Sequence, residues 1–242
     1  MHYDRSVPAS IRKLVLLPGT DGTGDLFKWF IEVLPAEFEA TVVRYPSDAF
    51  LSYEELGDIV RDAFPERDPF VLIAESFSTP VAIECAALNS PNLKGLILCA
   101  GFATSPLHGL RRTVCSLLPP FVFGARLPAS LVRFILVGRS APPYLVEAVQ
   151  DAIHSVQARV LLARLRMILG CDVRAMLGEV SVPIFYVRAM QDKLVPAQSL
   201  AEILKIKPEA TVASIPGPHL LFQCEPNRTA KAVEGFVCGL DR

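Results

Sequence analysis

The stretch Phe70-Val-Leu-Ile-Ala-Glu-Ser-Phe-Ser-Thr-Pro80 is the most informative part of the chain. It begins with an apolar run as long as a buried strand, and it ends at Pro80, which suits the first turn of a helix. Between the two lies Ser76, with a small residue two positions away on either side, Ala74 and Ser78. A serine held on a sharp strand-to-helix turn needs such neighbours, because larger side chains have no room there. The stretch predicts a nucleophilic serine, with simple capping of the helix by Ser76 as the alternative.

Outward from this stretch, apolar strands alternate with helical patterns. Further strands are expected at residues 11–17, 41–45, 93–100, 182–187 and 211–215, and helices at 53–64, 80–88, 196–206 and 226–237. Continuous apolar strands that alternate with helices indicate a parallel sheet with both faces covered. We therefore expect an α/β fold with a mostly parallel sheet of about six strands, whose carboxyl ends gather the functional residues.

The composition restricts the class of protein. The chain has 242 residues, of which 51% are hydrophobic and 20% charged, so it is not intrinsically disordered. The net charge of −1 gives no basic field to attract nucleic acid, and no apolar stretch approaches the ~18 residues of a membrane span. The N-terminus lacks the apolar segment of a signal peptide. We expect a cytoplasmic protein with reduced cysteines, no nucleic-acid partner and no membrane span.

Residues 102–179 break the alternation of strands and helices. They contain helical patterns at 131–137 and 145–167, several prolines and no good strand. Nine arginines, no lysine and four acids give this segment a net charge of +5. We interpret it as a helical lid inserted into a core formed by residues 1–101 and 180–242. Most of its arginines are expected to be solvated or paired, and an anionic partner such as an acyl carrier is the alternative.

The loop Leu17-Pro-Gly-Thr-Asp-Gly-Thr-Gly24 follows the first strand. It lacks the lysine of a phosphate-binding loop, and its glycine spacing is not that of a dinucleotide-binding turn. Such a loop beside the serine strand can offer the backbone N–H of Thr20 to an oxyanion, in addition to the N–H of Phe77 at the helix start. The alternative is a plain turn capped by Asp21 or Asp25.

His219 is the best candidate for a catalytic base. It follows the last strand in Ile215-Pro-Gly-Pro-His-Leu-Leu-Phe222, a stiff loop at the edge of the sheet where the serine is expected. The other histidines lie near the N-terminus (His2) or in the helical segment (His108, His154). A buried or surface histidine without a chemical role is the alternative for His219.

Asp192 lies just after the preceding strand, in Arg188-Ala-Met-Gln-Asp-Lys-Leu-Val-Pro196. A carboxylate at this position can orient the imidazole of His219 and stabilise its charged form. The alternatives are a helix N-terminal acid at this position and Asp172 as the partner of the histidine. The chain shows no metal-binding spacing of histidines or cysteines, so neither a metal nor a cofactor is expected.

These residues resemble the α/β-hydrolase superfamily along nearly the whole chain. The resemblance rests on the Leu17-Pro-Gly loop, the Ala74-Glu-Ser-Phe-Ser turn, Asp192-Lys-Leu-Val-Pro and Gly217-Pro-His-Leu-Leu, and on the chain order serine, aspartate, histidine. The turn departs from the superfamily in lacking both glycines, and Pro18 stands where histidine is common. Ten residues before Ile11 leave no room for the two antiparallel strands that usually come first, so a truncated sheet is expected.

The resemblance implies a serine hydrolase with Ser76, Asp192 and His219 as its triad and Thr20 and Phe77 as oxyanion donors. Its small carboxylesterase members are the most similar, including those that cleave methyl esters of carrier-bound acyl groups with basic lids. We expect a small-molecule ester with a short-to-medium acyl group as substrate. The alternatives are acyl transfer, thioester hydrolysis or carbon–carbon cleavage on the same triad, and a non-catalytic ligand receptor.

Overall fold

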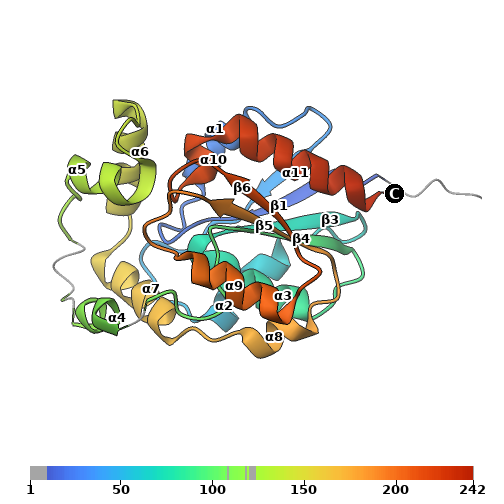
Figure 1. Ribbon diagram of the computed structural model, residues 1–242, viewed down its shortest axis with the longest axis horizontal. Coiled ribbons are helices and arrows are strands. Elements are labelled where there is room, and N and C mark those ends of the chain that lie inside the picture. The colour runs from blue at the N-terminus through green and yellow to red at the C-terminus, as the bar shows by residue number, and fades with distance from the viewer. Residues whose placement is uncertain (1–9, 108, 118, 120–123, 242) are drawn as a thin grey trace, which may run out of the picture.

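The computed structural model describes residues 10–107, 109–117, 119 and 124–241. In this part of the chain six parallel strands form one sheet in the order β2-β1-β3-β4-β5-β6 (Figure 1). The strands are β1 (Lys13–Leu17), β2 (Glu39–Val42), β3 (Phe70–Glu75), β4 (Leu93–Cys99), β5 (Ile184–Ala189) and β6 (Thr211–Ile215). The expected fold, a parallel six-stranded sheet between layers of helices, is confirmed.

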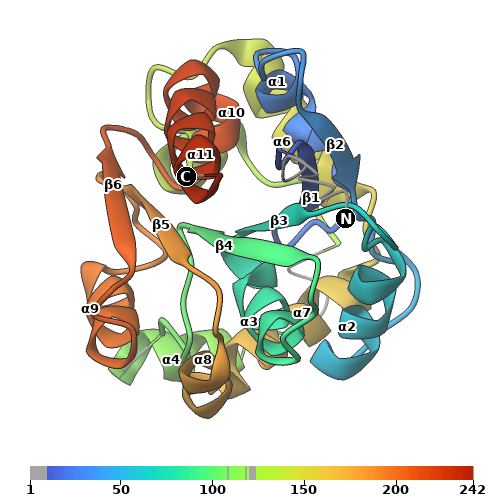
Figure 2. The ribbon, with the colours of Figure 1, turned by 90° about the vertical axis from the view of Figure 1, so that its right-hand side faces the viewer.

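Helices cover both faces of the sheet (Figure 2). One face packs against α2 (Tyr53–Asp62), α3 (Thr79–Ala87), α8 (Arg174–Glu179) and α9 (Ala197–Ile206). The other packs against α1 (Lys28–Ile31), α10 (Leu221–Cys224) and α11 (Pro226–Leu240). Because β3 lies at the centre of the sheet, all six of its residues are buried, and the two faces bury alternate side chains.

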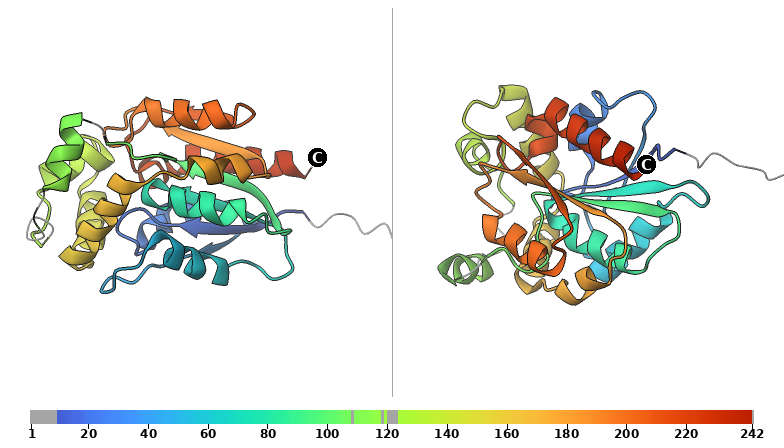
Figure 3. Two further views of the ribbon diagram at one scale, coloured as in Figure 1. Left: turned by 90° about the horizontal axis from the view of Figure 1, so that it is seen from below. Right: turned by 45° about the vertical axis from the view of Figure 1, so that its right-hand side comes forward.

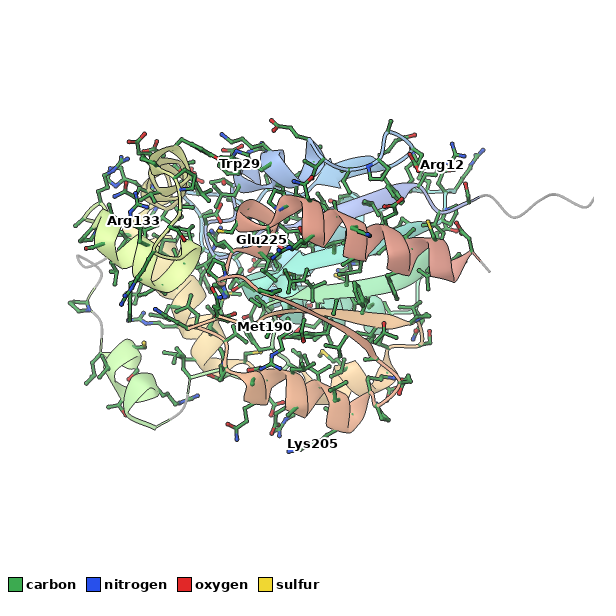
Figure 4. The ribbon with its side chains drawn as sticks, turned by 45° about the horizontal axis from the view of Figure 1, so that its top comes forward. Arg12, Trp29, Arg133, Met190, Lys205 and Glu225 are labelled. Carbon is green, nitrogen blue, oxygen red and sulfur yellow. The ribbon has the colours of Figure 1, made fainter. Side chains whose placement is uncertain are left out.

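The chain between β4 and β5 contains several helices, which lie at one end of the sheet (Figure 3, left). Its helices before α8 are α4 (Gly109–Ser116), α5 (Ala129–Val132), the π-helical turn η4 (Arg133–Val137), α6 (Pro143–His154) and α7 (Ala158–Gly170). In Figure 4, Arg133 marks this end, and Arg12, just before β1, marks the opposite end. The segment therefore lies over the carboxyl ends of the strands.

Two elements have bounds that differ from those predicted from the periodicity of the sequence. The pattern at 145–167 is interrupted between α6 and α7, where the chain turns and the Gln157 N–H donates to Ser47 O at 2.9 Å. The strand expected at 41–45 ends at Val42, because Tyr45 leaves the sheet and its N–H donates to Gly22 O at 2.8 Å. Both departures arise from tertiary hydrogen bonds, which local periodicity does not encode.

The six cysteines form no disulfide, and Cys85, Cys99 and Cys171 are buried. Within the described ranges, no helix combines the length and the apolar character that crossing a bilayer requires.

Candidate active site

Ser76 lies immediately after β3, on the turn into α3, and has a φ of +49°. This left-handed conformation is strained for a residue with a side chain, and such strain is stored mainly at functional turns. The residues on either side of the turn, Ala74 and Ser78, are fully buried, as the expected lack of space requires. Thr79 Oγ1 donates to Ser76 O at 2.8 Å and supports the turn from within the helix.

Ser78 stands where a glycine is common, and its hydroxyl has a structural use. It donates to Pro18 O, and it lies 2.8 Å from the Tyr45 hydroxyl. Ser78 is thus a buried junction between the serine turn, the loop after β1 and the chain after β2. A glycine at this position would leave the Pro18 carbonyl without that donor.

Ser76, His219 and Asp192 form a continuous hydrogen-bonded line. His219 Nε2 lies 2.8 Å from Ser76 Oγ, and His219 Nδ1 lies 2.8 Å from Asp192 Oδ2. The imidazole is buried, with 3% of its side chain exposed, so water does not compete strongly for these contacts. The three residues predicted from separate parts of the sequence are therefore side by side.

Backbone hydrogen bonds hold the two loops that carry Asp192 and His219. Gln191 N–H donates to Gly217 O at 2.9 Å, which joins one loop directly to the other. The second oxygen of Asp192, Oδ1, accepts the N–H groups of Leu194 at 2.8 Å and Val195 at 3.0 Å. These bonds leave Oδ2 free to face the imidazole, so the carboxylate is oriented before any substrate binds.

The electrostatic environment favours a charged imidazole. Burial by itself lowers the pKa of His219, but the hydrogen bond and charge of Asp192, together with the charge of Glu75, outweigh burial and raise the pKa above its ordinary value. Burial raises the pKa of the Glu75 carboxyl to about 7, which the nearby His219 partly opposes. The site beside Ser76 therefore holds a histidine and a glutamate whose pKa values are both raised.

Thr20 and Phe77 present backbone N–H groups near Ser76. Phe77 is the second residue of the short helical turn η2 (Ser76–Ser78), so its N–H has no partner within the turn. The Thr20 N–H has no acceptor among the residues that the structure describes. Thr20 and Ser76 line the same cavity. Both amides are therefore candidates for oxyanion donors, a role that remains a prediction.

A cavity of about 400 Å³ opens between Ser76 and the helical segment. Apolar side chains dominate its wall, and Asp21 is the one charged side chain among the described residues that line it. Its lining includes Phe102, Leu127, Val132, Ile135, Leu136, Leu161, Leu165, Ile168 and Val195. A cavity of this size is suited to a small molecule with a neutral, apolar body.

Many arginines of the helical segment bind carboxylates or backbone carbonyls of this same chain. Arg126 and Arg174 pair with Asp151 and Asp172. Backbone carbonyls accept hydrogen bonds from Arg112, Arg133, Arg159 and Arg164. These contacts agree with the expectation that most are paired, and the acyl-carrier partner remains a prediction.

The other candidates from the sequence do not meet at this site. Asp172 pairs with Arg174 and is about half exposed, and it makes no contact with His219. His154 ends α6, while His2 and His108 lie outside the described residues. No cluster of three or more potential metal ligands occurs in the described ranges.

Two residues at the site were not assigned from the sequence. Glu75 ends a buried strand, and an acid in an otherwise apolar run is a signal of an unusual environment. Arg164 shares the apolar face of α7 with Val160, Leu161 and Ile168, at a spacing of three or four residues. A cation on that face indicates a buried polar contact, and neither signal identifies the partner.

No protein-family model and no curated protein sequence matches the chain. Solved structures do. An esterase from Thermogutta terrifontis has a TM-score of 0.80 and 20% identity, covering 96% of this chain and 92% of the other. A lipase-esterase related protein from Clostridium acetobutylicum has a TM-score of 0.75 and 14% identity, covering 95% of this chain and 96% of the other. MenH from S. aureus has a TM-score of 0.74 and 15% identity, covering 96% of each chain. These likenesses show that the chain has the α/β-hydrolase fold.

Proposed function

We propose that this protein is a serine hydrolase that cleaves carboxylic esters with short-to-medium apolar acyl groups. The observation that carries the proposal is the hydrogen-bonded line from Ser76 through His219 to Asp192 at the wall of an apolar cavity. The same constellation performs acyl transfer on several unrelated folds, so geometry supports the assignment independently of the weak sequence identities. The esterases among the structural neighbours support it further.

The proposed reaction has two halves. His219 Nε2 removes the proton of Ser76 Oγ as the oxygen attacks the ester carbonyl carbon, and the carbonyl electron pair moves onto its oxygen. The N–H groups of Thr20 and Phe77 stabilise that oxyanion. When the tetrahedral intermediate collapses, the bond to the leaving alkoxide breaks and the alkoxide takes the proton from His219.

The acyl group is then bound to Ser76 as an ester. His219 removes a proton from water, the hydroxide oxygen attacks the acyl carbon, and Ser76 leaves with the proton returned by His219. Asp192 stabilises the imidazolium in both halves. The carboxylic acid product loses its proton to solvent water and becomes a carboxylate, and the apolar cavity with Asp21 in its wall favours the release of this anion.

The cavity supports a neutral acyl chain as the specificity element. Its volume of about 400 Å³ lies within the range of ~300–1,000 Å³ that small-molecule sites occupy. Because leucine, isoleucine and valine side chains dominate the wall, each added methylene gains burial until the cavity is full. An acyl group with its own carboxylate would lose hydration without gaining a cationic partner among the described lining residues.

The test is hydrolysis of p-nitrophenyl esters with acyl chains of two to sixteen carbons by the wild type and Ser76→Ala. We expect turnover that peaks at short-to-medium chains and falls by about 10³-fold or more in Ser76→Ala. A fluorophosphonate probe should label the wild type at Ser76, and tryptic mass spectrometry locates the adduct. Equal turnover by the two proteins would refute the assignment of Ser76.

The same experiment separates the competing functions. A preference for the matched thioester, or transfer to an added alcohol, would identify a thioesterase or acyltransferase on the same residues. Fluorophosphonate labelling without turnover of any ester or thioester would favour carbon–carbon cleavage. A folded protein that is neither labelled nor active would favour a ligand receptor.

A further inference from the structure

Arg164 is a buried cation that reaches from α7 to the loop after β1. Only 3% of the residue is exposed, and its guanidinium forms no ion pair with a described carboxylate, although the more distant charge of Asp21 offsets part of the cost of burial. Burying a guanidinium without a carboxylate is costly unless its N–H groups are satisfied by other acceptors. Such a residue is retained where its hydrogen bonds hold a particular arrangement of the backbone.

Three backbone carbonyls of the core accept those hydrogen bonds. Nη1 donates to Thr20 O and to Asp21 O, both at 2.8 Å, and Nη2 donates to Pro46 O at 2.9 Å. The first two carbonyls belong to the loop whose Thr20 N–H faces the Ser76 site in the proposed function. The planar, forked guanidinium can hold several acceptors at fixed angles, which a lysine ammonium on its single stem cannot.

The contact determines the direction of the peptide planes in this loop. Gly22 N–H donates to Gly19 O at 3.0 Å, which closes a turn with Thr20 and Asp21 at its centre. The peptide between those two residues can rotate in such a turn, and its direction distinguishes the turn types. Arg164 binds the carbonyl of that peptide and the carbonyl of the next one, Thr20 O and Asp21 O. The turn is therefore held both by its own Gly22–Gly19 hydrogen bond and by the guanidinium.

Gly22 shows that the loop is shaped around the guanidinium. Its φ is +71°, and a Cβ added there would lie 2.6 Å from Arg164 Nη1. Only glycine provides both the left-handed backbone and the space for the cation. The guanidinium carbon also lies 5.9 Å from the ring centre of Phe77 and 5.8 Å from that of Tyr45. The guanidinium therefore binds the turn that carries Thr20 and lies beside the ring of Phe77, the two residues with the predicted oxyanion donors.

We propose that Arg164 is a positioning residue, which holds the Thr20–Asp21 turn so that the Thr20 N–H is directed at the oxyanion. The inference rests on the proposed esterase function. It means that the oxyanion site is complete only when α7 is docked on the core. The helical segment then contributes to the chemistry through a backbone contact, in addition to forming the wall of the acyl cavity.

The test compares Arg164→Lys with Arg159→Lys, a control on the same helix whose guanidinium bonds to Asp48 O, away from the turn. Arg164→Lys is expected to lower kcat by about 10- to 100-fold with KM changed less than about threefold, because a displaced donor weakens only the transition state. Arg159→Lys is expected to leave both constants within about twofold. Thermal unfolding verifies that both variants are folded.

A pair of inhibitors separates positioning from general stability. An alkyl trifluoromethyl ketone adds Ser76 Oγ to its carbonyl carbon and forms an oxyanion, with the serine proton on His219, whereas the matched methyl ketone mainly occupies the cavity. In Arg164→Lys the Ki of the trifluoromethyl ketone should rise about as much as kcat falls, with the Ki of the methyl ketone unchanged. Equal changes in both Ki values, or no change, would overturn the proposal.

A second variant covers the case in which Arg164→Lys does not fold. Gly22→Ala keeps the arginine but places a methyl group against Nη1, and it should give the same split between kcat and KM. A Gly22→Ala protein with unchanged kcat and inhibitor constants would overturn the role of the contact. If the wild type shows no Ser76-dependent turnover, the proposed function itself fails, whereas wild-type turnover with unaffected variants refutes only the role of Arg164.

Discussion

Gln223 Nε2 donates at 3.2 Å to Oε2 of Glu75, which is next to Ser76 in the chain, while the other side-chain oxygen of each residue, Oε1, has no partner among the described residues. Two buried acceptors without donors are a strained arrangement for an ionised glutamate. A proton on Glu75 removes the charge and supplies a donor. Burial accordingly raises the pKa of this carboxyl to about 7. The unfolding free energy of the protein should therefore depend on whether the Glu75 carboxyl is protonated.

The first prediction concerns this coupling. Below pH ~4.5 Glu75 is protonated in both states; between 4.5 and 7 the unfolded chain loses the proton while the folded chain keeps it. The unfolded state then binds fewer protons, so the unfolding free energy falls as the pH rises, by about 3 kcal/mol in total. In Glu75→Gln this fall should disappear, which urea unfolding at pH 5 and pH 8 measures.

The titration of His219 changes the unfolding free energy in the same direction as that of Glu75. Its raised pKa gives a stabilisation that is present below pH ~6.5 and lost as the pH rises through the folded-state value. A residual pH dependence in Glu75→Gln is therefore expected from His219. A pH dependence as large as that of the wild type would mean that Glu75 is solvated and the assignment is wrong.

A second prediction follows for the pH profile of activity. Where Glu75 is ionised, above its pKa of about 7, its charge raises the pKa of His219, and His219 must be neutral to accept the serine proton. Glu75→Gln should therefore lower the pKa of His219 and move the acidic limb of kcat/KM to lower pH. Rates with p-nitrophenyl butyrate between pH 5 and 9 measure the limb. A limb that stays in place, or moves to higher pH, would contradict the coupling.

The third prediction tests the role of Asp192. Asp192→Asn keeps the oxygen that accepts the Leu194 and Val195 N–H groups, so the loop should remain folded. Its amide nitrogen would face His219 Nδ1 and favour the wrong tautomer, so kcat should fall by about 10³- to 10⁴-fold. Asp172→Asn is the control, because Asp172 pairs with Arg174 instead. Comparable losses in both variants would refute the orienting role of Asp192.

Much of the fold and of the candidate site could be predicted because the signals are local. The apolar run of β3 and the place of Pro80 in the first turn of α3 are visible within a few residues, and the structure contains both. Ser76, Asp192 and His219 could be proposed as neighbours because each follows a parallel strand, and the carboxyl ends of such strands meet at one edge.

The remaining features depend on contacts between distant parts of the chain. Arg164 and Thr20 are 144 positions apart, and nothing near either residue specifies that the guanidinium binds this carbonyl. Tyr45 was expected to continue a strand, but its N–H bonds to Gly22 instead. Ser78 reads locally as a small residue on a tight turn, and its junction with Pro18 and Tyr45 emerges only on folding.

The fourth prediction concerns that junction. Ser78→Ala leaves the buried Pro18 carbonyl and Tyr45 hydroxyl without their partner, which should lower the unfolding free energy by about 1–3 kcal/mol. The loop that carries Thr20 also loses a tether, so kcat should fall. Ser155→Ala is a matched control, since among the described residues its hydroxyl bonds only to Ala152 O, at its own helix end. Urea unfolding and kcat are measured for both, and equal effects would deny Ser78 a special role.

The last prediction tests the cavity as the acyl site. Leu165 lines it from α7, so Leu165→Trp should fill part of the space. A shortened cavity rejects the chains that no longer fit, and the loss of kcat/KM for p-nitrophenyl octanoate should be about 10-fold or more. The acetate ester, which needs little of the cavity, should change less than about twofold.

Leu88→Trp serves as the control for this change, because Leu88 is 63% exposed at the end of α3 and does not line the cavity. Its chain-length profile should match that of the wild type. The informative quantity is the ratio of kcat/KM for octanoate to that for acetate, which cancels differences in active-site content between preparations. A ratio that Leu165→Trp leaves unchanged would place the acyl chain outside the cavity. A ratio that falls only in Leu165→Trp would identify the cavity as the determinant of chain length.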